Sequence, residues 1–336
     1  LYTDKKLWSK LSQNGRKLVQ EEHSISKLEE GIRLSFQKLQ NSKGSTAKTA
    51  PLTSIVFVTY NNLQYTKGCV ASIQKYTGTP YELIFVDNAS KDGTHGYLRK
   101  LSKQMKNVKI ILNPGNKGFP YACNQGIAIS SGRYIVLLNS DVVVAEGWLD
   151  GMINRAESDE SIGIVGPMTN RISGYQMDPT AKYSNQLELR KFAINYRKKN
   201  LNKWLEVRRV AGFCMLIKRE VVDKIGGLDP LFGVGNCEDD DYCLRASKAG
   251  YRTVIAQDVF IHHYGGGSFL ANGKENYLSI LEKNSRVFKE KWGISPIEWW
   301  RDRKEPTKLA PVYVPLFDIK EKCKFLQSSG EVVALP

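Results

Sequence analysis

The run Tyr134–Val144, which reads Tyr-Ile-Val-Leu-Leu-Asn-Ser-Asp-Val-Val-Val, constrains the fold of this chain more than any other stretch. Its apolar part, Ile135 to Leu138, offers no polar side chain to solvent, which is typical of a strand buried on both faces of a sheet. The run then changes abruptly to Asn139-Ser140-Asp141, so a carboxylate leaves the sheet at its carboxyl edge. Ligands of open α/β sheets bind at that edge, although a turn or capping role is the commoner explanation for a single Asp.

Strand and helix patterns alternate from Ser54 onward. Each of the first strand-like runs is followed by a turn and a helical pattern, which predicts βαβ units and a mainly parallel central sheet flanked by helices. The first strands are expected at 54–59, 83–87, 108–112 and 134–138. Later strands are expected at 162–165, 210–218, 251–256 and 259–263. Residues 167–209 are polar, basic and weakly periodic, which indicates functional loops or a small helical insertion.

Three parts are expected along the chain. Residues 1–50 show leucines and isoleucines at helical spacing followed by a Ser/Thr/Lys-rich linker, which predicts a helical arm for docking or oligomerisation. Residues 51–272 form the α/β domain, with 167–209 as its basic insertion. Residues 273–336 form a C-terminal helical extension. The chain lacks an initiator Met and a signal peptide, so we expect it to be part of a longer protein.

The net charge of +15 is concentrated in flanking segments. Residues 181–209 alone hold nine Lys or Arg against two Asp or Glu. Such patches suit an anionic membrane surface, an acidic partner or nucleic acid, but no nucleic-acid fold signature is found. The six cysteines are scattered without a CxxC pair, and no apolar run is long enough to span a bilayer. We therefore expect a cytoplasmic protein with reduced thiols that is at most peripheral to a membrane.

Acidic side chains follow strands or loops at what would be one edge of the sheet. Asp87 ends the second strand, Asp141 follows the fourth, and Glu238-Asp-Asp-Asp241 opens a helix after a glycine-rich loop. One or two acids satisfy a helix N-terminus, whereas four repel one another. A catalytic carboxylate beside a metal or a hydroxyl substrate accounts better for the excess.

Two histidines, His262 and His263, end a strand and could supply a metal ligand together with Asp141. The loop Asn113-Pro-Gly-Asn-Lys-Gly118 could present backbone N–H groups to an anion. It matches neither the P-loop nor the dinucleotide fingerprint, which excludes the usual P-loop NTPases and dehydrogenases. The sequence also lacks a nucleophile elbow.

In this order the motifs resemble those of the inverting family-2 glycosyltransferases of bacteria, which have the GT-A fold. The resemblance covers residues 53–270 approximately and leaves out the N-terminal arm, the basic insertion and the tail. Its motifs are Ser54-Ile-Val-Phe-Val-Thr-Tyr-Asn-Asn62, Val86-Asp-Asn-Ala-Ser-Lys-Asp-Gly93, Asn116-Lys-Gly-Phe-Pro-Tyr-Ala-Cys-Asn-Gln-Gly126, Leu137-Leu-Asn-Ser-Asp141, Gly226-Gly-Leu-Asp-Pro230, Glu238-Asp-Asp-Asp-Tyr-Cys-Leu-Arg245 and His262-His-Tyr-Gly265.

The resemblance implies a role for each matching position. The nucleotide of the donor would be bound by Thr59, Tyr60, Asn62, Asp87, Asn116, Lys117, Gly118, Asn139, Ser140 and Asp141. Asp141 would bind a divalent cation, Mn²⁺ or Mg²⁺, with His263 or its neighbour His262 completing the metal site. Asn139 replaces the first carboxylate of the family's DxD motif. Asp239 would be the general base in a catalytic pair with Glu238.

The implied reaction is direct displacement of a nucleoside diphosphate by a hydroxyl of a glycan or protein acceptor. A cation stabilises the leaving diphosphate, and a carboxylate takes the acceptor proton. A UDP-sugar such as UDP-GlcNAc is the first expectation for the donor and dTDP-rhamnose the second. Two alternatives remain at this stage: a sugar nucleotidyltransferase, whose glycine-rich basic first loop is missing, and a non-catalytic basic scaffold for an anionic polymer.

Overall fold

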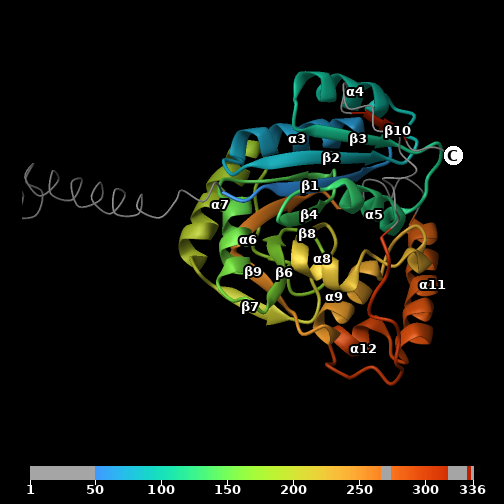
Figure 1. Cartoon of the computed structure of the whole chain (residues 1–336). Coiled ribbons are helices and arrows are strands. Elements are labelled where there is room, and N and C mark those ends of the chain that lie inside the picture. Colours follow the sequence, from blue (N-terminus) through green and yellow to red (C-terminus); the bar gives the residue numbers. More distant parts are fainter. Residues whose placement is uncertain (1–49, 266–273, 317–330, 334–336) are drawn as a thin grey trace, which may run out of the picture. The chain divides into compact units, whose positions relative to one another are not determined.

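The computed structural model describes residues 50–265, 274–316 and 331–333, and residues 51–336 form one compact unit. The predicted N-terminal helical arm lies outside the described residues. Helices and strands alternate through the first half of the chain (Figure 1). The elements of this half are β1 (Thr53–Thr59), α3 (Leu63–Tyr76), β2 (Tyr81–Asp87), α4 (Thr94–Gln104), β3 (Val108–Leu112), α5 (Phe119–Ile129), β4 (Tyr134–Leu138), β5 (Val142–Val143) and α6 (Trp148–Glu157).

The second half is less regular. Its elements are β6 (Ile162–Thr169), α7 (Gln186–Asn200), β7 (Trp204–Val207), β8 (Cys214–Lys218), α8 (Arg219–Ile225), the short 3₁₀ helix η1 (Pro230–Phe232), α9 (Glu238–Lys248), β9 (Arg252–His263), α11 (Lys274–Trp292), α12 (Pro296–Trp300) and β10 (Glu331–Val333). The basic insertion contains the expected helix, α7, and also the strand β7. The C-terminal extension is mainly helical, but β10 adds a strand to it.

One sheet with the strand order β10-β3-β2-β1-β4-β8-β6-β9-β5 runs through the unit, and β7 pairs with β9. Strands β10, β3, β2, β1 and β4 are parallel, and β8 is inserted antiparallel between β4 and β6. The chain moves outward from β1 through β2 to β3 and then returns to place β4 on the other side of β1. The carboxyl ends of β1 and β4 therefore flank a topological switch point, where open sheets bind ligands.

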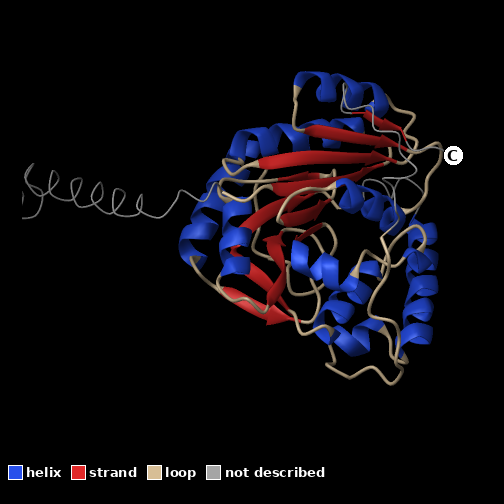
Figure 2. Cartoon of the chain, in the orientation of Figure 1, coloured by secondary structure: helices blue, strands red, loops and turns tan. Residues whose placement is uncertain are grey.

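Helices cover both faces of the sheet (Figure 2). Because neighbouring residues of a strand point to opposite faces, Ile55 and Phe57 pack on the side covered by α3, α4 and α6, whereas Val56 packs toward α5, α8 and α9. Phe288 and Trp292 of α11 are fully buried on the second side. The C-terminal helices are therefore part of the core around the switch point.

The prediction of two strands at 251–256 and 259–263 was wrong, because β9 is one strand with an irregularity. Its register against β6 moves from Pro167↔Ala256 to Met168↔Phe260. The extra residues form a bulge, in which the buried Asp258 accepts a hydrogen bond from the Asn202 N–H at 3.0 Å. Bulges leave residues unpaired without ending a strand. The polar pair Gln257-Asp258 therefore looks like a turn in the sequence, although it lies within one strand.

Candidate functional site

Asp87 is held in a fixed orientation at the end of β2. Its Oδ1 accepts hydrogen bonds from the Thr59 hydroxyl at 2.9 Å and the Ser90 hydroxyl at 2.5 Å, and its Oδ2 accepts one from the Ser90 N–H. Asp87 is almost fully buried. The structure thus brings the predicted donor residues Thr59 and Asp87 together and adds Ser90, which the sequence reasoning missed.

The turn after β1 is tied to the loop after β2. Asn61 and Asn62 adopt left-handed backbone conformations, with φ of 59° and 63°, which Asn tolerates better than most residues. The Asn61 N–H donates to the Ser90 hydroxyl, and the Asn61 side chain accepts from the Lys91 N–H at 2.8 Å. These bonds fix the turn that carries Tyr60 and Asn62.

The loop before α5 is shaped around Gly118. The Gly118 N–H donates to Asn116 Oδ1 at 2.9 Å, and Asn88 Nδ2 donates to the same oxygen at 3.2 Å. Gly118 has φ of 85°, and a Cβ atom there would lie 2.0 Å from the carbonyl oxygen of Gly233. Only glycine satisfies both constraints. Asn116 and Lys117 are exposed beside it.

The Asn139-Ser140-Asp141 segment leaves the sheet beside the end of β9. Asp141 Oδ1 lies 3.4 Å from His263 Nε2. His263 Nδ1 lies 2.8 Å from the carbonyl oxygen of Arg171 and must carry the hydrogen of that bond. In the neutral ring, Nε2 therefore presents its lone pair toward the Asp141 carboxylate. Phe213 stacks on His263 with ring centroids 4.9 Å apart and keeps the imidazole in this plane.

His262 is placed differently from its neighbour. Its Nδ1 lies 2.7 Å from the Tyr183 hydroxyl, and its ring meets Tyr264 edge-on at 4.4 Å. Burial is the main cause that lowers the pKa of His262 to about 4, and His263 adds to it. Because successive strand residues point to opposite faces, His263 is the histidine that reaches Asp141.

The four acids at the start of α9 are all buried. The helix follows Asn236 and Cys237, both in left-handed conformations. Arg209 lies 3.3 Å from Asp239 Oδ2 through Nη2 and 3.1 Å from Asp240 Oδ1 through Nε. The Gly212 N–H also donates to Asp239 Oδ2, at 2.9 Å. One guanidinium thus serves two neighbouring carboxylates.

Burial raises the pKa of two acids of this cluster, Glu238 and Asp240. Burial, followed by repulsion from Asp239, raises the pKa of Glu238 well above its ordinary value. Burial raises the pKa of Asp240 to about 7, and Arg209 opposes that shift. Glu238 Oε2 is buried without a hydrogen-bond partner among the described residues. An unpartnered buried carboxyl oxygen is costly in a folded protein, and a bound substrate hydroxyl would satisfy it.

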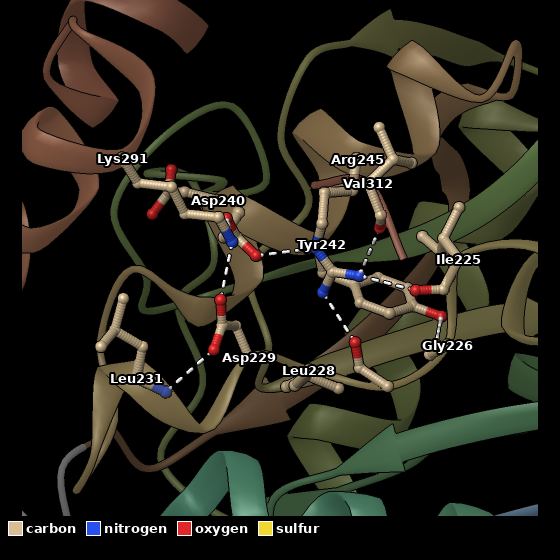
Figure 3. Close-up of polar contacts among 12 residues, drawn as sticks. Ile225, Gly226, Leu228, Asp229, Leu231, Asp240, Tyr242, Arg245, Lys291 and Val312 are labelled. Atoms are coloured by element: carbon tan, nitrogen blue, oxygen red, sulfur yellow. Dashed lines mark hydrogen bonds and ion pairs between the residues drawn. The ribbon is translucent and has the colours of Figure 1, made fainter. Parts of the chain in front are cut away.

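Asp241 belongs to a separate, structural network. Its Oδ2 accepts from Arg245 Nε at 2.8 Å, and its Oδ1 lies 2.7 Å from Lys291 Nζ and accepts from Trp292 Nε1 at 2.8 Å. Lys291 also pairs with Asp229 at 2.7 Å. Figure 3 shows Lys291 reaching Asp229, and Arg245 facing the backbone of Ile225 and Val312. These contacts join α9 to α11 and to the 310–314 segment.

A cavity of about 500 Å³ connects the end of β9 with the acids of α9. Asn139 and His263 line one part of it, and Glu238, Asp239 and Asp240 line another. Arg171 and Arg209 contribute two cationic side chains to the same wall. The structure therefore brings residues from the ends of β4, β9 and the start of α9 around one space.

The two arginines that end the basic insertion both have partners within the protein, and Arg209 also lines the cavity. Both residues belong to the basic patch at 181–209, which suits an anionic partner. Arg208 pairs with Glu305 and donates to the carbonyl oxygens of Trp299 and Lys304, whereas Arg209 pairs with two acids of α9. Both guanidinium groups are therefore held by contacts within the protein.

Among the described residues, no helix combines the length and apolar character needed to cross a membrane. The five cysteines there are free and buried: Cys69, Cys123, Cys214, Cys237 and Cys243. Their thiols carry no disulfide across the core. The described residues also contain no group of three or more His, Cys, Asp and Glu side chains that could hold a metal ion.

Curated relatives of the chain are glycosyltransferases. An uncharacterized glycosyltransferase of Haemophilus influenzae is 30% identical over 119 residues, which span 35% of this chain and 37% of that protein. Glycosyltransferase AglE of Haloferax volcanii is 26% identical over 64% of this chain and 67% of its own length. The N-acetylglucosaminyl-diphospho-decaprenol L-rhamnosyltransferase of Mycobacterium tuberculosis is 23% identical over 73% of this chain and 87% of its own length.

Solved structures share the fold at low sequence identity. A mannosyltransferase of Pyrobaculum calidifontis, solved with GDP-Man and Mn²⁺, superposes with a TM-score of 0.55 at 17% identity and covers 74% of this chain and 68% of its own. GalNAc-T7, solved with UDP, GalNAc and Mn²⁺, gives a TM-score of 0.55 at 18% identity, with 73% of this chain and 49% of its own covered. The predicted GT-A fold is confirmed.

The family is shown by the sequence itself. Residues 54–226 match the profile of the family described as glycosyl transferase family 2, and this stretch holds β1 to α8 with the predicted donor loops. The match excludes the two alternative functions of the domain, a sugar nucleotidyltransferase and a non-catalytic scaffold. This chain belongs to glycosyl transferase family 2 and is a glycosyltransferase with a GT-A fold.

Proposed function

We propose that the protein is an inverting glycosyltransferase that moves a sugar from a nucleoside diphosphate to a hydroxyl group of a glycan or protein acceptor. The cavity carries this proposal, because Asn139 and His263, the neighbour of Asp141, line the same space of about 500 Å³ as the acids Glu238 and Asp239. The residues around His263 suit the leaving diphosphate, and the acids of α9 suit the attacking hydroxyl. A displacement between them needs no enzyme nucleophile and inverts the anomeric carbon.

The donor end is assigned to the loops after β1, β2 and β3. Asp87, held by Thr59 and Ser90, is proposed to accept a hydrogen bond from the base, and the loop Asn116-Lys117-Gly118 is proposed to lie along the nucleotide. UDP-sugars, UDP-GlcNAc foremost, are the favoured donors and dTDP-rhamnose is second. GalNAc-T7 binds UDP, and the name of the mycobacterial relative includes an L-rhamnosyl group.

The residues at the end of β9 fit a divalent cation. His263 donates through Nδ1 to a backbone carbonyl and turns toward Asp141 its buried Nε2, which has no hydrogen-bond partner among the described residues. This is the usual second-shell arrangement of a ligating histidine. Mg²⁺ and Mn²⁺ sites of this kind use few protein ligands, because substrate phosphates and water supply the rest. A cation bound there would stabilise the negative charge on the leaving diphosphate.

Asp239 is proposed as the general base. Its carboxylate lines the cavity and is oriented from three sides, by Arg209, the Gly212 N–H and the Asp240 N–H. Glu238, whose pKa is raised by burial, is proposed to hydrogen-bond a substrate hydroxyl through the oxygen that has no partner among the described residues. The cytoplasmic location and the acceptor class remain expectations of the sequence.

The test is a thermal-shift screen of UDP, dTDP, GDP and ADP, each with Mn²⁺, Mg²⁺ or a chelator. A ligand at 100 times its dissociation constant adds about 2.7 kcal/mol to stability. We expect UDP to stabilise the protein most, and more with Mn²⁺ than with chelator. The anomeric configuration of the product, measured by NMR, then tests inversion. No shift with any nucleotide, or a retained configuration, would contradict the proposal.

A further inference from the structure

We propose that Tyr175 and Trp300 form an acceptor subsite that stacks against the apolar face of a sugar ring, so that the acceptor is a glycan of at least two residues. This inference rests on the proposed function, because it places the glycan beside the carboxylates assigned to the attacking hydroxyl. It narrows the acceptor from any hydroxyl to a saccharide that extends beyond the cavity.

Arg209 connects the acids of α9 to this pair of aromatic rings. While Nη2 and Nε contact Asp239 and Asp240, Nη1 donates to the carbonyl oxygen of Ser173 at 3.1 Å and to its hydroxyl at 3.2 Å. The guanidinium carbon also lies 5.5 Å from the centre of the Trp300 ring. A single planar side chain thus lies between the proposed base and the aromatic pair.

In the aromatic pair Trp300 is partly buried against the core and Tyr175 is exposed. Tyr175 and Trp300 meet edge to face with ring centroids 5.9 Å apart. Gly174 adopts φ of 98°, which other residues rarely do, and lies in ordinary contact range of Arg209 and Trp300. Tyr175 nevertheless keeps 49% of its surface in solvent. The neighbours of Tyr175 order its ring, and one face of the ring remains open to a ligand.

The segment that carries Tyr175 borders the cavity with residues before and after this tyrosine. Ser173 and Met177, two residues before and after Tyr175, both line the cavity, and Met177 is 45% exposed. A chain of sugars with one hydroxyl at Asp239 would leave the cavity past this segment. The next ring of such a chain is the group that meets Tyr175.

The chemistry of the pair suits a pyranose ring. One face of many pyranoses presents C–H groups, and aromatic rings bind such a face while the surrounding hydroxyls remain hydrated. Tyr and Trp combine a large apolar ring with a polar edge, which suits a sugar whose peripheral hydroxyl groups remain hydrated. Arg209 is already paired with two carboxylates, so the subsite offers little net charge to an anionic polymer.

The experiment titrates the protein with disaccharides such as cellobiose, maltose and N,N′-diacetylchitobiose, and follows binding by saturation-transfer NMR. Tyr175→Ala should weaken the binding of the preferred disaccharide at least about fivefold, and Tyr175→Phe should stay near wild type, because the ring and not the hydroxyl makes the contact. Tyr313→Ala is the matched control, since Tyr313 is 55% exposed and lies in the segment whose Val314 bonds to Ile225. It should bind like wild type.

The thermal shift with UDP and Mn²⁺ is recorded on every variant to separate the two proposals. An unchanged UDP shift in Tyr175→Ala with lost disaccharide binding supports the subsite. Wild-type disaccharide binding in Tyr175→Ala overturns it, and so does a wild-type protein that binds UDP but no disaccharide of the panel. Disaccharide binding that depends on Tyr175 without any nucleotide shift would keep the subsite and remove the donor assignment.

Discussion

His263 Nε2 lies 3.4 Å from Asp141 Oδ1, and the two residues come from strand ends that are 122 positions apart in the chain. The pairing of β5 with β9 sets this distance, because Val142 is opposite His263 in the antiparallel register. The adjacent His262 bonds Tyr183 instead. A shift of one residue in this register would exchange the two histidines and remove the pair.

The two histidines should therefore differ in their effect on metal dependence. His263→Ala should abolish most of the additional stabilisation that Mn²⁺ gives to the UDP complex, with metal affinity reduced at least about tenfold. His262→Gln should keep that dependence, because its ring faces Tyr183. Thermal shift with UDP over a Mn²⁺ titration measures both. If the two variants showed the same Mn²⁺ dependence, the assignment of His263 as the metal ligand would be wrong.

Asp239→Asn should reduce sugar transfer by about 10²–10⁴-fold, which is the usual contribution of a positioned base. UDP binding with Mn²⁺ should survive, since the proposal places Asp239, which lines the cavity, on the acceptor side. The measurement is initial velocity together with the nucleotide thermal shift. Loss of nucleotide binding in this variant would place Asp239 on the donor side instead.

The raised pKa of Asp240 predicts a pH dependence of stability. A carboxyl group with a higher pKa in the folded state binds more protons when folded, so stability falls as pH rises between the two pKa values. For Asp240 that window runs from its ordinary 3.8 to about 7, and Glu238 shifts in the same direction. Urea unfolding from about pH 5 to about pH 8 should show a smaller loss for Asp240→Asn than for wild type. Parallel curves would contradict the shift.

Asp241→Ala should destabilise the fold without a direct effect on the cavity. Arg245 is fully buried and would lose the carboxylate that accepts from its Nε, and breaking one side of a buried ion pair costs about 3–5 kcal/mol. Glu157→Gln removes the exposed partner of Arg133 and should change the free energy of unfolding by at most about 1 kcal/mol. Denaturant unfolding compares the two. Similar small losses would mean that Lys291 and Trp292 do not depend on Asp241.

Gly118→Ala should disturb the loop proposed to hold the nucleotide. The new Cβ would meet the Gly233 carbonyl at 2.0 Å in a left-handed conformation, so we expect a loss of about 1–3 kcal/mol in stability and weaker UDP binding. Gly115→Ala in the same loop has no neighbour within 4 Å at its Cβ and serves as the control. If both variants bind UDP like wild type, the loop does not contact the nucleotide.

The sequence alone determined the architecture of the first half and the places where carboxylates leave the sheet. Strands such as Ile135–Leu138 are buried on both faces, so their composition is apolar throughout, and Asp87 and Asp141 follow directly from the strand ends. These properties are local, because burial pattern and turn residues are written in consecutive positions. The alternation of elements then implies the parallel arrangement and its binding edge.

Only the tertiary structure decided how the four acids of α9 are divided. Consecutive residues of a helix point in different directions, so Asp239 and Asp240 meet Arg209 whereas Asp241 meets Arg245, Lys291 and Trp292. The same holds for the bulge that keeps β9 continuous and for the contact between Arg209 and Trp300. Each depends on which distant segments pack together, and no local pattern of residues encodes that choice.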